Sequence, residues 1–414
     1  MVPIKFFGRE EEPSTEEFRM PRTAIAAIAT KQKANELRTV FATVEDPRSR
    51  KPTHNLIDMI FIALCAAICG CDAWTDVESF AKQKIGWLRK FLTLENGVPS
   101  HDTFSRVFNA LNEDQLCSAL TRWLALLGKN PKGQHIAIDG KSLRRSFDSA
   151  SGTSMLHLVN AWSTEHGICF GQQSVDEKSN EITAVPKLLE LIRVNGAVFS
   201  LDALHCQHQT AQTIVDKGGD YVISVKGNQL KLAEAIQDAF IAAEESEEAS
   251  KSAKLRTKVE KADAKGGRKN RITRTYSVMP VPVSLKTAFP GIGSIARVYR
   301  EQQRPQKDGS MKRTESVSFF VSSMRPMVRD LARIIRGHWK VENQLHWSLD
   351  VNFGEDQRRN RKNNGAAIAG FISRLALSIL QQDTSIKKTS LRCKRKICGW
   401  NSQALEEVLA GFSR

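Results

Sequence analysis

The chain has 414 residues, 41% of them hydrophobic, which is enough for a substantial core and longer than one average domain. Its 61 Lys and Arg against 45 Asp and Glu give a formal net charge of +16, which favours a polyanionic partner, nucleic acid before an anionic membrane. The longest apolar run, LIDMIFIALCAAICGC from Leu56, contains Asp58 and stops at Gly70, too short for a transmembrane helix. It predicts a buried helix instead.

The N-terminus and the cysteines indicate a cytoplasmic protein. The first residues, MVPIKFFGREEEPS, carry acids where a secretory signal requires an apolar core and a small-residue cleavage site. The 8 cysteines are irregularly spaced and form no two paired C-x-x-C halves of a zinc site. We expect them to be reduced thiols, mostly packed in core helices.

The first part of the chain is predicted to be helical. Residues 1–40 form an N-terminal extension of mixed charge with one possible helix, and residues 41–130 have apolar side chains at helical spacing. We expect 41–130 to be a helical N-terminal domain and a candidate for DNA binding. It contains Ser100, His101 and Asp102 side by side, but the members of a hydrolytic triad meet in space rather than in sequence. A helix cap at Ser100 or Asp102 is therefore favoured.

Residues 131–385 read as a mixed α/β domain. Its predicted elements are, in order, the strands HIAIDG, MLHLVNAWS and GICFGQQSV, the helix ITAVPKLLELIRVNG, the strand AVFSLDA, the helix QTAQTIVDKGG and the strand DYVISVKG. An insertion is expected at about 245–322. It begins with a charged exposed linker and continues with the strands RITRTYSV, SIARVYREQQR and SVSFFVSS. Helical spacing returns from Met327, and residues 386–414 form a basic C-terminal tail.

Two strands of this domain end on an acid. Asp139 closes the first strand and Asp202 closes a later one, so two strand ends of one sheet are expected to bring two carboxylates together. Such a pair repels unless a cation lies between its members, and Mg²⁺ is the usual cation for oxygen ligands. Two such ions suit in-line displacement at phosphorus. The alternative for each acid is an ordinary turn, since Asp-Gly after a strand is common in turns.

Several cations are predicted near these strand ends. Lys141, Arg144 and Arg145 follow Asp139, and Lys226 follows a further strand. We expect them to contact the phosphate backbone of DNA as it approaches the metal site. The alternative for each one alone is solvated surface charge.

A third carboxylate is expected from a later helix. His338, Glu342 and His346 recur every four residues and share one helix face, and Gly354 is expected to end the helix. Glu342 is the candidate, because a helix is a more rigid mount than the loop predicted to carry Glu355. The alternative is that both histidines only pack around Trp339 and Trp347.

These residues resemble the DDE transposases of bacterial insertion sequences, most closely the group of H-repeat-associated proteins. The matching segments, in chain order, are DPRSRKPTHNL, PSHDTFSRVF, IAIDGKSLRRS, KSNEITAVPKLLELI, SLDALHCQ, GGDYVISVKGNQ and HWKVENQLHWSLDVNFGEDQ. The similarity covers nearly everything after about residue 40. Related transposases carry a Tyr, an Arg and a Lys at fixed distances around the glutamate, where this chain has Ile335, His338 and Leu349.

The resemblance implies an RNase H-like mixed-sheet catalytic core and cut-and-join chemistry on the ends of a mobile element. Asp139, Asp202 and Glu342 would be the catalytic and metal-binding acids, with one Mg²⁺ between the aspartates and a second shared by Asp139 and Glu342. Mn²⁺ is expected to substitute. His338 matches the arginine of relatives and is expected to touch DNA. The implied partners are the terminal inverted repeats and target DNA, bound by a homodimer, and the implied location is the nucleoid in a bacterial cytoplasm.

Three other functions fit parts of the sequence. The first is an RNase H-like nuclease that cuts without joining, and the second is a catalytically inactive DNA-binding remnant. The third is a transition-metal protein that uses the histidines and cysteine of HCQH (His205, Cys206, His208) together with His338 and His346. Surface or capping roles are favoured for His205 and His208, which lie at a predicted helix start.

Overall fold

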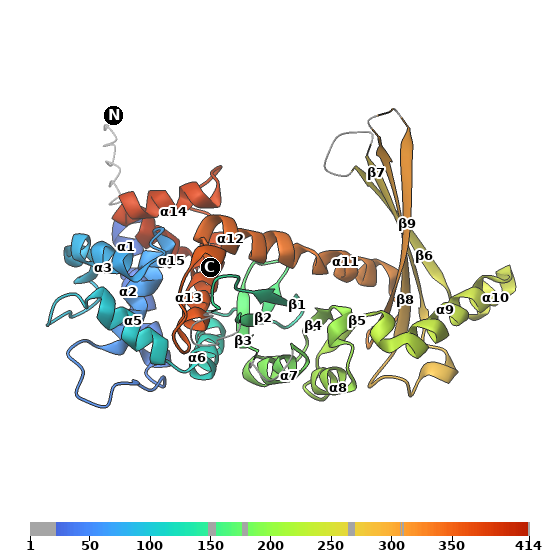
Figure 1. The fold of residues 1–414 in the computed structure, drawn as a ribbon, viewed down its shortest axis with the longest axis horizontal. Helices are drawn as coiled ribbons and strands as arrows, with labels where there is room; N and C mark the ends of the chain where they lie inside the picture. The colour runs from blue at the N-terminus through green and yellow to red at the C-terminus, as the bar shows by residue number, and fades with distance from the viewer. Residues whose placement is uncertain are drawn as a thin grey trace, which may run out of the picture.

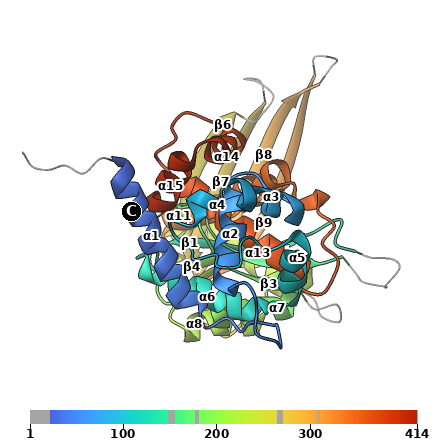
Figure 2. The ribbon, with the colours of Figure 1, turned by 90° about the vertical axis from the view of Figure 1, so that its left-hand side faces the viewer.

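The computed structural model describes residues 22–147, 155–175, 181–263, 270–306, 308 and 310–412. Helices gather at one end of the molecule, a mixed β-sheet occupies the middle, and a ribbon of long strands stands out at the other end (Figure 1). Figure 2 looks onto the helical end. In the part of the chain that the structure describes, no helix is both long and apolar enough to cross a membrane.

The N-terminal helices confirm the helical reading of residues 41–130. Those within 41–130 are α2 (Leu56–Ile68), α3 (Trp74–Gln83), α4 (Ile85–Leu88), α5 (His101–Ala110) and α6 (Glu113–Leu126), and α1 (Arg22–Phe41) is the helix expected in the N-terminal extension. The apolar run that begins at Leu56 is the buried helix α2, whose first turn is capped by the Asn55 side chain. Ser100 caps α5 by accepting a hydrogen bond from the Thr103 N–H, so the predicted cap is also confirmed.

One mixed sheet carries the middle of the molecule. Its spatial order is β3 (Cys169–Ser174), β2 (His157–Ser163), β1 (His135–Ser142), β4 (Val198–Leu201), β5 (Asp220–Val225), β9 (Met311–Ser322), β8 (Ser294–Pro305), β7 (Arg271–Pro280) and β6 (Arg256–Asp263). Strands β1, β4 and β5 run parallel, and the other neighbouring pairs are antiparallel. The predicted mixed α/β fold is confirmed.

Helices cover both faces of this sheet. Helices α7 (Glu181–Leu191) and α8 (His208–Asp216) pack on one face, and α11 (Val328–His338) lies across the other (Figure 1). Two short 3₁₀ turns, η1 (Ala203–His205) and η2 (Gly227–Gln229), follow β4 and β5. The carboxyl ends of these parallel strands therefore lead into tight turns at one edge of the sheet.

Strands β6–β9 extend the sheet as the ribbon, together with α9 (Leu230–Glu244), α10 (Glu247–Ser252) and the short turn η3 (Val283–Leu285). The three predicted strands of the insertion are β7, β8 and β9. The stretch expected to be an exposed linker is different, because it forms α10 and the edge strand β6. Edge strands are commonly charged and exposed, so β6 shows no apolar pattern in the sequence.

The C-terminal part of the chain is helical throughout. After α11 come a π-helical turn, η4 (Glu342–His346), then α12 (Trp347–Phe353), the 3₁₀ turn η5 (Glu355–Gln357), α13 (Gly365–Gln382), α14 (Leu391–Trp400) and α15 (Ser402–Gly411). Gly354 ends α12 in the left-handed conformation, as predicted. The residues expected as a basic tail form α14 and α15, in which Lys394 and Arg395 are buried and bonded to Asp383 and Asp72.

Candidate active site

Asp139 and Asp202 are neighbours on adjacent strands of the sheet; Asp139 was expected to end its strand, but β1 continues past it to Ser142, whereas Asp202 directly follows β4. Strands β1 and β4 are parallel and pair Ile138 with Leu201, so the next residue on each strand is one of the two acids. Neighbouring strands lie about 4.8 Å apart. Side chains alternate along a strand, so the face that carries Asp139 also carries His135, and the face that carries Asp202 also carries Ser200. A hydrogen bond of 2.7 Å between His135 and Ser200 shows that this is the same face of the sheet.

Helix α11 is fixed to this face by a chain of hydrogen bonds. The Ser200 hydroxyl bonds His135 Nε2 at 2.7 Å and His338 Nδ1 at 2.8 Å, and Thr164 Oγ1 bonds His135 Nδ1 at 2.9 Å. Burial lowers the pKa of His135 to about 3 and that of His338 to about 4, so both rings are neutral at pH 7. His338 therefore serves to dock the helix beside Asp202, whose charge partly opposes the fall in its pKa.

Gly337 allows this close approach. A Cβ atom at Gly337 would lie 2.8 Å from His135 Nδ1, closer than real Cβ contacts. A larger residue would have to push α11 away from β1. The position of the helix that leads to Glu342 thus depends on a glycine.

Glu342 lies in the sequence between two histidines that contact the sheet near the aspartates. Four residues before it, His338 is docked at Ser200, and four residues after it, His346 Nδ1 lies 3.7 Å from Asp139 Oδ2. Glu342 opens the π-helical turn and is exposed. π-helical turns are rare and are frequent at functional sites. The structure thus places the two histidines, but not Glu342 itself, in contact with the region of the aspartates.

Lys141 braces strand β1 against the helix that follows Glu342. Its ammonium group lies 2.7 Å from Asp350 on α12 and 3.3 Å from Asp356 on η5, with Glu355 at 3.8 Å. Its side chain is 6% exposed. Lys141 therefore offers no free charge to a DNA backbone, and the structure differs from the sequence-based expectation for this residue.

A second buried cation continues this brace. Arg374 of α13 pairs with Glu355 at 2.5 Å, and its Nε donates to the Asn160 side chain at 2.5 Å. Asn160 lies on β2 directly opposite Asp139. The strand that carries Asp139 is thus held from two sides, by Lys141 along its own length and by Asn160 beside it.

The remaining predicted cations are open to solvent. Arg144 and Arg145 lie just past β1 and are exposed, and Arg144 is 3.3 Å from Asp356. Lys226 directly follows β5, the strand next to β4, and is also exposed. These three side chains lie near the strand ends that carry the aspartates, where a polyanion would approach them.

Sequence reasoning missed the buried ion network. Its signals are an arginine inside the apolar helix FISRLALSIL and an asparagine inside the apolar strand HLVNAWS. Both side chains are fully buried, Arg374 at 1% and Asn160 at 0% exposure. Buried polar groups require partners, so each is a sign that other polar residues converge on it.

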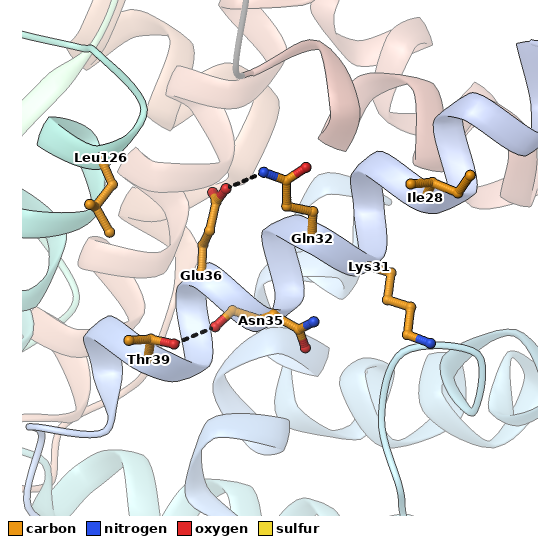
Figure 3. A pocket seen from close by; sticks show the side chains of 7 residues that line it. All are labelled: Ile28, Lys31, Gln32, Asn35, Glu36, Thr39 and Leu126. Carbon is orange, nitrogen blue, oxygen red and sulfur yellow. Dashed lines mark hydrogen bonds between the residues drawn. The ribbon is translucent and has the colours of Figure 1, made fainter.

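The acids do not form a closed metal cage. Among the described residues, no group of three or more His, Cys, Asp or Glu side chains is close enough together to hold a metal ion. This applies to the carboxylates and to the histidines and cysteine of HCQH, of which His205 and Cys206 are buried and His208 packs on Phe289. The surface also has a hollow between α1 and α6, lined by the side chains shown in Figure 3. None of its lining residues belongs to β1 or β4.

Two family models match most of the chain. A family model described as Transposase DDE domain matches residues 130–379, and one described as DDE_Tnp_1-associated matches residues 38–124. The putative transposase YncI of Escherichia coli O157:H7 is 33% identical over 363 residues, 88% of this chain and 91% of that protein. The H repeat-associated putative transposase YhhI of Escherichia coli K12 is 33% identical over 367 residues, 87% of this chain and 94% of that protein.

A third relative covers less of the chain. It is an uncharacterized protein in the dhlA 3′ region of Xanthobacter autotrophicus, 44% identical over 201 residues, 48% of this chain and 68% of that protein. The matched catalytic model confirms that the mixed sheet is an RNase H-like core. The match spans β1 to α13 and includes both strand-end aspartates and the helix of Glu342. The chain therefore belongs to the family of DDE transposases.

Proposed function

We propose that this protein cuts DNA at the ends of an insertion sequence and joins those ends to a target by strand transfer. Asp139, Asp202 and Glu342 are the proposed catalytic acids. The observation that carries the proposal is the register of β1 and β4, which makes the two aspartates neighbours beneath the helix of Glu342. The charge of +16 and the exposed Arg144, Arg145 and Lys226 support a DNA substrate.

The acids suit a divalent cation such as Mg²⁺ or Mn²⁺. The Asp139 side chain is 24% exposed and the Asp202 side chain 46%, so solvent reaches both. Asp202 is held in place by the Leu204 N–H, which donates to its Oδ1 at 3.1 Å. Carboxylate oxygens are the ligands that such ions prefer. When bound, these ions supply charge neutralisation and Lewis acidity at the reacting phosphate.

The reaction requires no protein nucleophile. In the cutting step, the oxygen of a water molecule bonds to phosphorus and the bond from phosphorus to the 3′ oxygen breaks, leaving a 3′-hydroxyl and a 5′-phosphate. In the joining step, that 3′ oxygen bonds to a target phosphorus and displaces the target's own 3′ oxygen. The protein's part is to hold both DNA segments against one rigid set of acids, since a misplacement of about 1 Å costs on the order of a hundredfold in rate.

Joining two ends at once requires two active sites, so we propose that a homodimer acts in the complex with DNA. Light scattering with and without terminal DNA measures this. A complex with two protein chains and two DNA ends is expected, and a complex with one chain and one end would contradict the dimer.

The test uses duplexes that carry the element's terminal sequence, a target duplex and Mg²⁺. Asp139→Asn and Asp202→Asn are each expected to bind the terminal duplex and to yield neither nicks nor joined products. The matched control is Asp216→Asn, an exposed acid at the end of α8 on the opposite face of the sheet, which should retain both products. Nicks without joined products from the wild-type protein would favour the nuclease, and binding without nicks would favour an inactive remnant. Mg²⁺-dependent cleavage by either aspartate variant would overturn the assignment of the site.

A further inference from the structure

The outer half of the ribbon carries a row of cations on one face. At the base of the ribbon, this face is the one that packs against α11, through Tyr276, Val278, Ala296 and Val298. Because side chains alternate along a strand, the same face continues outward with Arg274 on β7, Arg300 and Arg304 on β8, and Lys312 on β9. We call these four residues and Arg336 of α11 the basic ribbon face.

The cations of this face lie directly opposite one another. Arg274 is paired across β7 and β8 with Arg300, and Arg304 is paired across β8 and β9 with Lys312. Like charges in such positions destabilise a sheet. Burial, followed by the charges of Arg336 and Arg300, lowers the pKa of Arg274, and the charge of Glu260 opposes this shift.

Few acids neutralise these charges. Among the described residues of β6–β9 on this face, Glu260 is the one acid; it lies opposite Arg274, binds Lys258 at 2.7 Å and accepts from the Tyr276 hydroxyl at 3.2 Å, so a single carboxylate faces several cations. None of the described acidic side chains forms an ion pair with Arg274, Arg300 or Arg336. The face thus keeps an excess of positive charge at a cost in stability.

The opposite face of the same strands behaves differently. There Arg297 pairs with Glu244, and Arg313 pairs with Glu301 at 3.1 Å and Glu315 at 2.8 Å. Both faces carry arginines, and they differ in whether acidic side chains pair with those arginines. Cations without acidic partners on one face indicate that an anion binds to this face.

We propose that the basic ribbon face binds the sugar-phosphate backbone of the DNA segment that leads into the active site. This inference rests on the proposed function and adds a second binding surface to it. Arg336 lies near the end of α11, six residues before Glu342 in the sequence. Arginine binds phosphate with two parallel hydrogen bonds, so a phosphate between Arg274 and Arg300 relieves their repulsion.

The experiment compares two double variants with the same change in charge. Arg274→Gln with Arg300→Gln removes one opposed pair from the basic ribbon face, and Arg297→Gln with Arg313→Gln removes two arginines from the opposite face. The affinity for a short duplex of unrelated sequence is measured at several salt concentrations. The first variant should lower the log-log slope by about 1, since the one phosphate between the two arginines contributes about 0.9, and the second should leave it unchanged.

The Tm of each variant and the activity of the wild type are measured separately from DNA affinity. Removing opposed like charges should not lower the Tm of the first variant, and Lys312→Gln at the exposed end of the ribbon should lower the slope by about 1 without a change in Tm. Equal slopes for the wild type, Lys312→Gln and both double variants would overturn the proposal, as would equal losses from both faces. Wild-type nicking and joining of terminal DNA, measured in parallel, reports on the proposed function independently of this result.

Discussion

Replacing Lys141 by methionine tests whether this lysine is a structural brace or a DNA contact. The change keeps an unbranched side chain but leaves Asp350, Glu355 and Asp356 without their shared cation. Breaking a buried ion pair from one side costs about 3–5 kcal/mol, and we expect about 3 because Glu355 keeps Arg374. At roughly 2 °C per kcal/mol for a large domain, the Tm should fall by about 6 °C in calorimetry without DNA or metal.

Arg144→Met is the matched control. Arg144 also contacts Asp356 and lies three residues further along, but its side chain is 81% exposed. Exposed pairs contribute about 0–1 kcal/mol, so the Tm of this variant should stay within about 2 °C of the wild type. An unchanged Tm for Lys141→Met, together with weaker DNA binding, would refute the brace and restore the sequence-based interpretation of Lys141.

Three further predictions follow from the same face of the sheet. Glu342→Gln should abolish cutting and joining with an unchanged Tm, whereas Glu355→Gln should lower the Tm because it weakens the buried pair with Arg374. Loss of activity in Glu355→Gln and loss of stability in Glu342→Gln would make Glu355 the catalytic acid and Glu342 the structural one. Gly337→Ala should cost about 1–3 kcal/mol in urea unfolding, because its Cβ meets His135, and a neutral result would contradict the close approach. The folded pKa of His135 is about 3 and its ordinary value 6.5, so the unfolded chain binds the proton first. Stability should therefore fall as the pH drops from about 6.5 towards 3, and His135→Gln should make this fall shallower in urea titrations at several pH values.

The sequence alone predicted the helices and strands whose hydrophobic pattern lies within one short segment. Strands such as HIAIDG and SFFVSS, and the buried helix α2, each carry enough consecutive apolar residues to indicate their type. An acid after an apolar run is also a local signal, so the neighbouring positions of Asp139 and Asp202 in the sheet were predicted from the sequence, although β1 continues past Asp139 to Ser142. Strand β6 was missed because an exposed edge strand has no buried face to impose a pattern.

Relations between distant segments were decided by the tertiary structure. Lys141, Arg144 and Arg145 look alike in the sequence, but Lys141 points along the inner face of β1 into the acids of α12 and η5, and the other two lie beyond the strand end. The tail likewise became two packed helices because Asp72 and Asp383 provide partners for Arg395 and Lys394. Charge is a property of one residue, whereas its burial and its partner depend on which elements pack around it. The sequence therefore determined which acids lie side by side on β1 and after β4, and the packing of α11 to α13 on the sheet decided which cations pair with acids in the interior and which face solvent.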